Sequence, residues 1–313
     1  MDMKPSFFIV GAPRCGTTTL SRCLKNHPAI CFSKPKEPHY FSKLDRHVSS
    51  EIIQAEYVEK YFSHTKVHHQ AMGEGSPSYL YSPSGLQAIL AFNPGAKFIV
   101  MVRNPVESVY SFHYRLVYLM QEDQRDFQKA WDLQEARAQG QHIPRLCHNS
   151  AMLQYGEVGQ YGKYLEQLFE IAGPEKCKVV VFDDLKKSVL VTYKDVLTFL
   201  GLEYDGRTKF SHKMASRTYR FHWLNRMIWH PPTSIKYIRA QLEKSDLKKK
   251  KSLGHILLLK LKRLNDIKRP PPPMSCHMRN VLRESFSDDI DRLGRLLNRD
   301  LSHWKTEEAL PRP

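Results

Sequence analysis

The sequence has little cysteine and no long apolar run, and both absences limit what the protein can be. Its 313 residues include six cysteines, none of them in a C-x-x-C pair. Six cysteines are too few for a disulfide scaffold in a chain of this length, and the lack of paired cysteines argues against a structural zinc site. No segment approaches the roughly 20 apolar residues of a membrane span, and no signal-peptide pattern follows the N-terminus. We therefore expect a cytoplasmic protein with reduced thiols, no metal and no transmembrane helix.

Acidic residues are also scarce, and the resulting positive charge is concentrated late in the chain. The sequence contains 48 Lys and Arg against 32 Asp and Glu, a net charge of +16. Residues 234–269 contribute +9 of that charge, and Pro270–Pro273 follows them as a stiff spacer. Within this stretch, residues 248–263 mix lysines with leucines, as a helix at a membrane surface does. They predict peripheral contact with an anionic membrane or a lipid-linked acceptor. The alternative is a packed helix with a solvated lysine face.

Short β-rich apolar runs alternate with longer amphipathic segments over most of the chain, which is typical of a parallel sheet wrapped by helices. We expect one α/β domain over residues 1–313, with a P-loop-like central parallel sheet flanked by helices. A basic and proline-rich helical excursion is expected within it at residues 234–273. The predicted strands are 7–10, 30–33, 97–102 and 178–182, and the predicted helices include 16–26, one starting at Asn104-Pro105, 158–171 and 274–297.

A glycine-rich loop between the first predicted strand and helix has the features of an anion site. Gly11 and Gly16 are five residues apart, which lets the backbone bend around an anion and direct N–H groups toward it. The following helix adds the positive end of its dipole. A nucleotide-triphosphate P-loop would have lysine where Thr17 stands, whereas here the cation is Arg14, inside the loop. The loop thus fits an anion without the usual magnesium-bound γ-phosphate; the alternative is an ordinary glycine turn with an exposed arginine.

A second candidate anion site follows the strongest predicted strand. Arg103 lies at the carboxyl end of that strand, where open α/β sheets bind ligands. Ser111 lies about two turns along the next predicted helix. An arginine fork and a hydroxyl could hold a second phosphate. Alone, Arg103 in a surface salt bridge and Ser111 on a polar helix face would be the simpler interpretation, but the first loop favours the phosphate site.

These two segments resemble the sulfotransferases that use 3′-phosphoadenosine-5′-phosphosulfate (PAPS). The family's first motif grips the 5′-phosphosulfate and its second motif grips the 3′-phosphate. Arg14 stands where many members carry lysine, and Arg103 and Ser111 match the second motif at its eight-residue separation. The resemblance implies that Arg14, Gly16, Thr17, Thr18, Arg103 and Ser111 hold PAPS or its product PAP. We also expect Cys15 and Thr19 of the same loop among the cofactor-binding residues. In the basic segment 211–220, Lys213 or Arg217 could close over the 3′-phosphate; the alternative is a solvated basic loop.

Three other segments extend the resemblance over most of the chain. Residues 36–41 look like the Glu-x-His-aromatic-Phe segment of heparan-sulfate-type and related bacterial enzymes. Residues 74–80 resemble their substrate-cleft segment, with Gly75 where many relatives have lysine, and residues 298–304 look like the ending of bacterial members. The resemblance implies sulfuryl transfer without a metal from PAPS to a hydroxyl or amine. The acceptor expected is a glycan, a glycolipid or a small natural product.

The resemblance also suggests catalytic roles. Glu37 is the candidate general base, with His39 as the second choice or as a positioning group. His39 would also contact the acceptor, and Glu74 would orient either the acceptor or a loop lysine. Arg14 and the amides of residues 16–18 would hold the departing phosphate. Local alternatives remain open, because Glu37 could simply pair with Lys34 or Lys36 and His39 could be a buried, hydrogen-bonded ring.

Two other classes of function compete with this interpretation. A P-loop kinase or nucleotide hydrolase would explain the glycine loop, but Thr17 replaces its lysine and no clear acidic strand end is available for magnesium. A basic module that binds polyanions would explain the net charge, although charge describes partners and not fold. No nucleic-acid motif accompanies the charge, so we expect no nucleic-acid partner.

Overall fold

A computed structural model describes residues 4–43, 53–210, 217–230 and 260–306. Their contacts form two compact units. The first comprises residues 1–109, 156–213 and 279–313, and the second comprises residues 110–155 and 214–278. The single domain expected over residues 1–313 stays a prediction.

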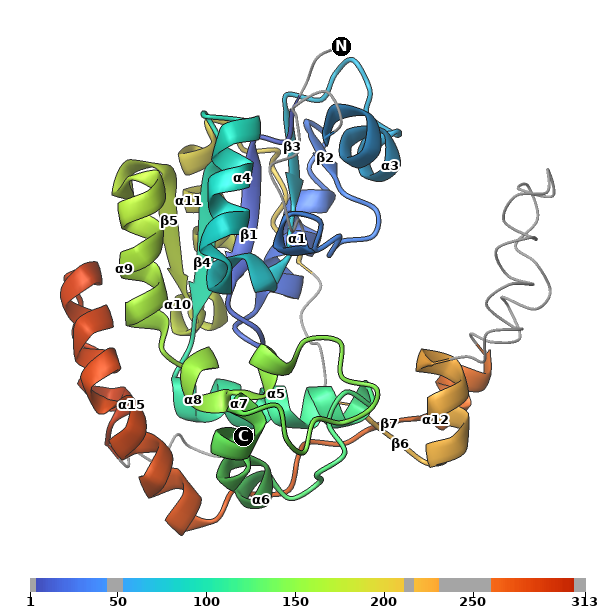
Figure 1. Cartoon of the computed structure of the whole chain (residues 1–313). Helices are drawn as coiled ribbons and strands as arrows, with labels where there is room; N and C mark the ends of the chain where they lie inside the picture. The colour runs from blue at the N-terminus through green and yellow to red at the C-terminus, as the bar shows by residue number, and fades with distance from the viewer. Residues whose placement is uncertain (1–3, 44–52, 211–216, 231–259, 307–313) are drawn as a thin grey trace. The chain divides into compact units, whose positions relative to one another are not determined.

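The first unit is built on a five-stranded parallel sheet with the strand order β2-β3-β1-β4-β5 (Figure 1). The central strand β1 is buried along its whole length, as is all of β4 after its first residue. Strands buried on both faces of a parallel sheet read as continuous apolar runs, which explains why these two are plain in the sequence. The strand bounds are β1 (Phe7–Gly11), β2 (Ile30–Phe32), β3 (Ala71–Glu74), β4 (Lys97–Val102) and β5 (Cys177–Val181).

Helices cover both faces of this sheet. Figure 1 shows α4 (Pro83–Phe92) and α9 (Tyr161–Ala172) packed together on one face, while α1 (Thr17–Lys25) packs against α11 (Val189–Leu200) on the other. The predicted α/β architecture, a P-loop-like parallel sheet flanked by helices, is therefore confirmed. Further elements are η1 (Phe41–Lys43), η2 (Gln54–Val58), α3 (Glu59–Phe62), η3 (Pro77–Tyr81), α5 (Pro105–Tyr118), α8 (Tyr155–Val158), η5 (Pro174–Lys176), α10 (Phe182–Lys187), α15 (Cys276–Leu297) and η6 (Ser302–Trp304).

Strand β3 has no counterpart among the predicted strands. Its sequence, Ala-Met-Gly-Glu, contains no β-branched residue, so it lacks the local signal of a strand. It is extended because it pairs with β1 on one side and β2 on the other. Gly73 is required there, because a Cβ at this position would lie 2.1 Å from the Phe7 ring. The predicted strand 178–182 is also shifted by one residue, since Phe182 begins α10.

The second unit contains short helices and a two-stranded antiparallel sheet of β6 and β7. Of the predicted basic excursion, residues 231–259 lie outside the described residues. Residues 260–265 are helical and lead into β7. The bounds are α6 (Phe127–Asp132), α7 (Gln134–Ala138), η4 (Ser150–Leu153), β6 (Arg217–Tyr219), α12 (His222–Trp229) and β7 (Asp266–Lys268).

A fully buried ion pair lies in the core of the second unit. The guanidinium of Arg137 donates two hydrogen bonds to the Glu122 carboxylate, at 2.7 and 2.8 Å. Neither side chain is exposed, and the Tyr155 hydroxyl donates a third bond to Glu122 at 2.7 Å. Removing one partner from such a pair leaves an uncompensated buried charge, which costs about 3–5 kcal/mol.

We predict that Arg137→Ala lowers the free energy of unfolding by about 3–5 kcal/mol, because it leaves the Glu122 carboxylate buried without its counter-ion. The matched control is Lys163→Ala, which removes the partly exposed ion pair of Lys163 with Glu157. It should cost no more than about 1 kcal/mol. Urea denaturation measures both values. Equal losses for the two variants would contradict the assignment of a stabilising role to the buried pair.

Candidate active site

The candidate site residues gather where the strands of the parallel sheet end. The glycine loop follows β1, Arg103 follows β4, and Phe182 follows β5. Glu74 is the last residue of β3, and Glu37 lies a few residues beyond β2. Because all five strands run in the same direction, their carboxyl ends share one edge of the sheet, which is the edge where open α/β sheets bind ligands.

The loop after β1 has the backbone of an anion cradle. Gly16 is the N-cap of α1 with φ 95°, and it has no side chain with which to cap the first-turn amides. Arg14 also has a positive φ, 63°, so the loop bends tightly before the helix starts. A Cβ at Gly16 would lie 2.9 Å from the Phe182 ring, so glycine is required here both by conformation and by space. This loop fits the phosphate group of a nucleotide, which uncapped helix amides and an arginine would hold.

The remaining residues of the loop differ in what they offer a ligand. Cys15 is fully buried, and burial raises the pKa of its thiol to about 11. Its thiol is therefore protonated at neutral pH, and its N–H donates to the Ala12 carbonyl at 3.3 Å. Thr17 is buried, whereas Thr18 and Thr19 are half-buried in the first turn of α1. All six expected residues of the first motif stay predicted ligands, and Cys15 offers no exposed side chain among them.

Arg103 is brought to the glycine loop by an aromatic ring. Its guanidinium lies over the ring of Phe182 at 4.8 Å, and the same ring contacts the Gly16 position. Arg103 also forms an ion pair with the partly exposed Glu107 at 3.6 Å. This is the surface salt bridge that the sequence analysis gave as the alternative to a phosphate site. An exposed pair of this kind is weak and can exchange for a phosphate. Ser111 lies on α5 but belongs to the second unit, so it stays a predicted ligand.

The two segments after β2 and β3 are held together by His39. Its backbone N–H donates to Ser76 Oγ at 2.9 Å, and its ring Nδ1 lies 2.7 Å from Ser78 Oγ. Its Nε2 faces Glu37 Oε2 at 3.8 Å. His39 is half-buried and hydrogen-bonded, and its role as a base or as a positioning group for Glu37 stays a prediction.

Glu37 is a partly exposed carboxylate with two cationic or potentially cationic neighbours. Lys36 Nζ donates to Glu37 Oε1 at 2.6 Å. Burial raises the pKa of Glu37, but the nearby His39 ring and the charge and hydrogen bond of Lys36 outweigh it and lower the pKa to about 2. Glu37 is therefore ionised at neutral pH and can accept a proton, although its bond to Lys36 weakens it as a base.

Glu74 is the opposite case, a fully buried carboxyl group. Within the described chain, neither of its oxygens has a hydrogen-bond partner of good geometry, although the hydroxyls of Tyr57 and Tyr79 are close by. Burial is the main cause that raises its pKa to about 8, and the charge of Glu37 adds to it. Glu74 is thus neutral at pH 7. Because its side chain is fully buried in this conformation, its role in orienting the acceptor stays a prediction.

The two basic residues expected to close over the 3′-phosphate are not placed at this site. Lys213 lies outside the described residues. Arg217 belongs to the second unit, where it pairs with Asp266 at 2.8 Å across β6 and β7. Both stay predictions.

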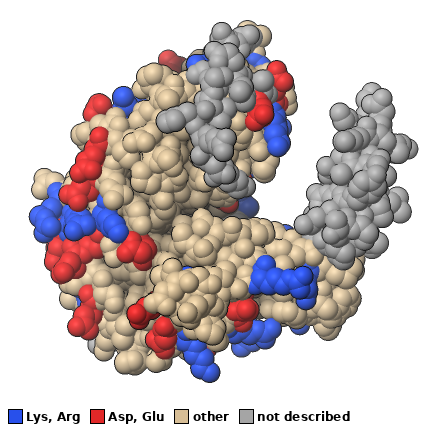
Figure 2. Space-filling view, in the orientation of Figure 1, with Lys and Arg blue, Asp and Glu red and all other residues tan. Residues whose placement is uncertain are grey.

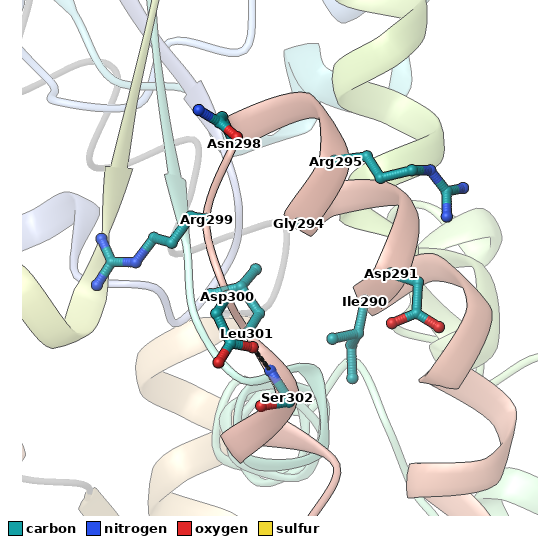
Figure 3. A pocket seen from close by; sticks show the side chains of 9 residues that line it. All are labelled: Ile290, Asp291, Gly294, Arg295, Asn298, Arg299, Asp300, Leu301 and Ser302. Carbon is teal, nitrogen blue, oxygen red and sulfur yellow. Dashed lines mark hydrogen bonds between the residues drawn. The ribbon is translucent and has the colours of Figure 1, made fainter.

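The segment 298–304 anchors the end of α15. Arg299 forms an ion pair with Asp184, and Trp304 Nε1 donates to Asp183 at 3.0 Å, so the segment is tied to α10. Figure 3 shows a hollow beside it, where Asp300 accepts the N–H of Ser302 at 2.8 Å. The residues that line this hollow lie apart in sequence from the strand-end residues and include none of them: Ile290, Asp291, Gly294, Arg295, Asn298, Arg299, Asp300, Leu301 and Ser302.

With this geometry established, comparison with known proteins identifies the class. Residues 5–206 match the model of the sulfotransferase family. That match covers more than half of the chain, so the chain belongs to the sulfotransferase family. The resemblance inferred from the two anion motifs is thereby confirmed at the level of the family.

Individual relatives are more distant. Carbohydrate sulfotransferase 15 of Mus musculus is 28% identical over 250 residues, and the match covers 63% of this chain and 44% of that protein. The membrane-associated sulfotransferase kil1 of Dictyostelium discoideum is 30% identical over 117 residues, or 37% of this chain and 24% of that protein. The chain thus spans less than half the length of these curated relatives.

A solved structure supports the fold. The crystal structure of a sulfotransferase from Alicyclobacillus acidocaldarius superposes with a TM-score of 0.67 at 24% identity, and the match covers 97% of this chain and all of that one. Two other features concern only the described part of the chain. None of its helices is long and apolar enough to cross a membrane. Nor does it contain a group of three or more His, Cys, Asp or Glu side chains arranged to hold a metal ion.

The buried carboxyl group of Glu74 predicts a pH dependence of stability. Its pKa is about 8 in the folded protein against 4.5 for an ordinary glutamate, so the folded state holds a proton that the unfolded state has lost. Folding stability therefore falls as the pH rises between those two values, by up to about 1.4 kcal/mol per pH unit.

We predict that Glu74→Gln removes this loss, because glutamine is neutral at every pH. Urea unfolding of both proteins at pH 5, 6.5 and 8 should show that the free energy of unfolding of the variant increases relative to that of the wild type as the pH rises. Glu59→Gln, on an exposed carboxylate of α3, is the control and should follow the wild type. A constant difference between Glu74→Gln and the wild type across this range would disprove a raised pKa.

Proposed function

We propose that this protein is a PAPS-dependent sulfotransferase that moves a sulfuryl group to a hydroxyl or amine of an acceptor. The observation that carries the proposal is the contact of one ring, Phe182, with both the Gly16 loop and Arg103. Two anion-binding elements thereby meet at one edge of the sheet, as the two phosphate groups of PAP require. Membership of the sulfotransferase family supports the same activity.

The residues of the site divide the chemistry among them. PAPS, when bound, supplies a sulfuryl group attached to a phosphate leaving group. Arg14 and the amides of residues 16–18 would hold the 5′-phosphate, and one such donor is worth about 3–4 kcal/mol in a transition state. Arg103 would hold the 3′-phosphate. Glu37 would accept the acceptor's proton, with His39 to position it. Because a sulfuryl group carries less charge than a phosphoryl group, we expect these cations to suffice without a metal.

The acceptor that fits best is a carbohydrate, a glycolipid or a small natural product. This part of the proposal is supported by the similarity to carbohydrate sulfotransferase 15, a relative whose name gives a substrate class. A carbohydrate hydroxyl needs a general base, and the partly exposed Glu37 carboxylate can act as one.

The competing functions find less support. A P-loop kinase would have lysine where Thr17 stands, and two of the carboxyl groups at this edge are poorly suited to magnesium, because Asp184 is paired with Arg299 and Glu74 is neutral and buried. Metal-dependent turnover of ATP would restore this alternative. On the face drawn in Figure 2, acidic and basic side chains of the described residues are interspersed. Strong salt-dependent binding of DNA without sulfuryl transfer would favour a polyanion-binding module.

A group of exposed apolar and basic residues in the second unit supports peripheral contact with an anionic membrane. Phe221, Trp223 and Leu264 are 55%, 62% and 68% exposed. Arg226 and Arg263 are exposed beside them in sequence. Aromatic rings flanked by cations are typical of segments that lie at a lipid surface.

We predict that the protein sediments with vesicles containing anionic phosphatidylserine at low salt and not with neutral phosphatidylcholine vesicles. The double variant Phe221→Ser/Trp223→Ser should reduce the bound fraction several-fold. Val67→Ser, at an 83% exposed apolar residue of the first unit, should leave it unchanged. If the wild type fails to sediment with anionic vesicles at low salt, the membrane contact is wrong.

The activity itself is tested with labelled PAPS and a panel of desulfated polysaccharides, glycolipids and aminoglycosides. Glu37→Gln should bind PAP with unchanged affinity but transfer sulfuryl groups about 10²–10⁴-fold more slowly, because it removes the base. A near-normal rate would remove Glu37 from the mechanism. If the wild type releases no PAP from PAPS with any of these acceptors, the proposed function itself fails.

A further inference from the structure

The side chain of Lys36 connects the anion loop to the candidate base, Glu37. Lys36 Nζ lies 2.6 Å from Glu37 Oε1 and 3.4 Å from Thr17 Oγ1. Its side chain is 24% exposed, so the ammonium is partly shielded from water but remains accessible to a ligand. A plain ion pair between neighbours would explain the first contact but not the second, which reaches 19 residues back to the first turn of α1.

The position of Lys36 is fixed by its backbone. Its carbonyl accepts a hydrogen bond from Ser33 Oγ and another from the Gly75 N–H, both at 3.1 Å. Those bonds tie it to the ends of β2 and β3. The side chain then passes over Gly75, where a Cβ would lie 3.1 Å from Lys36 Cε and 3.0 Å from Ser21 Oγ. Because Gly75 has no side chain, the aliphatic part of Lys36 can cross it and reach Thr17.

We propose that Lys36 is a further catalytic residue of the proposed sulfuryl transfer, and that its ammonium stabilises the charge developing between sulfur and the 5′-phosphate. This inference rests on the proposed function. In the reaction, the bond from the acceptor oxygen or nitrogen to sulfur forms as the bond from sulfur to the phosphate oxygen breaks. The electron pair of the broken bond leaves with PAP, and the acceptor proton goes to Glu37. Lys36 is placed for this role because its contact at Thr17 lies in the turn that would hold the phosphate.

The same geometry couples Lys36 to the strength of the base. In the absence of an anion, the ammonium pairs with Glu37 and helps to hold the pKa of that carboxyl low. When the ammonium turns toward an anionic donor, Glu37 loses this partner and becomes a better proton acceptor. The other groups facing Glu37 are the ring of His39, which also lowers its pKa, and the carboxyl of Glu74, which is neutral at pH 7.

The first test is Lys36→Met, measured as release of PAP from PAPS with water as acceptor and with the best acceptor of the panel. We expect kcat to fall about 10²–10³-fold, the scale for one donor to a developing negative charge, while the affinity for PAP changes less than about tenfold. The acidic limb of the pH profile of kcat/KM should move to higher pH. The matched control is Lys34→Met, on an exposed lysine two residues earlier, and it should behave as the wild type.

The second test transfers the cation to a new position. In Lys36→Ala, the lysine stem no longer crosses Gly75, and a new side chain there needs only a small shift of the Ser21 hydroxyl. Lys36→Ala/Gly75→Lys should therefore have a kcat at least tenfold above that of Lys36→Ala. Lys36→Ala/Gly75→Met is the control and should recover none. Equal recovery with methionine would show that charge is not needed, and turnover of Lys36→Met within threefold of wild type would show that the lysine is not needed. Either result overturns the inference and leaves the proposed function intact. If the wild type itself shows no turnover with any acceptor, the proposed function is contradicted instead.

Discussion

The contact of the Phe182 ring with both Gly16 and Arg103 is the interaction on which the rest of the site depends. The ring begins α10 directly after β5, while its two partners follow β1 and β4. Parallel pairing of these three strands brings their ends to one edge, and the ring then sets the separation of loop and guanidinium. Since Gly16 is needed for both its positive φ and its lack of a Cβ, this contact admits little variation.

Two carboxyl groups near this edge are held in opposite protonation states by their surroundings. Glu37 is partly exposed and paired with Lys36, so it is ionised, whereas Glu74 is buried and neutral at pH 7. Environments that separate two pKa values in this way are typical of acid–base sites. Because Glu74 is neutral at pH 7, Glu37 has no negative charge from Glu74 beside it. The ionised carboxylate can then respond to the position of one lysine, which links binding of an anion to the basicity of Glu37.

The sequence was sufficient for the architecture and for the parts of the site with a strong local signal. Strands such as β4 are continuous apolar runs, and the glycine loop is defined by spacing alone. Strand β3 was missed because its four residues carry no strand propensity and are extended only by their neighbours. The roles of Phe182 and Lys36 were missed because each depends on contacts between strand ends far apart in sequence. For Ser111, Lys213 and Arg217, motif matching remains the basis of the prediction.

The most direct test of the account is a calorimetric titration of adenosine 3′,5′-bisphosphate into the wild type, Arg103→Ala and Arg22→Ala. The account predicts that the wild type binds one equivalent and that PAPS competes for the site. Arg103→Ala should bind at least about tenfold more weakly, because it loses a charge-assisted bond to phosphate. Arg22, an exposed residue of α1, serves as the control and its variant should bind as the wild type does. Absence of binding to the wild type, or equal affinity for all three proteins, would contradict a two-phosphate site at this edge of the sheet.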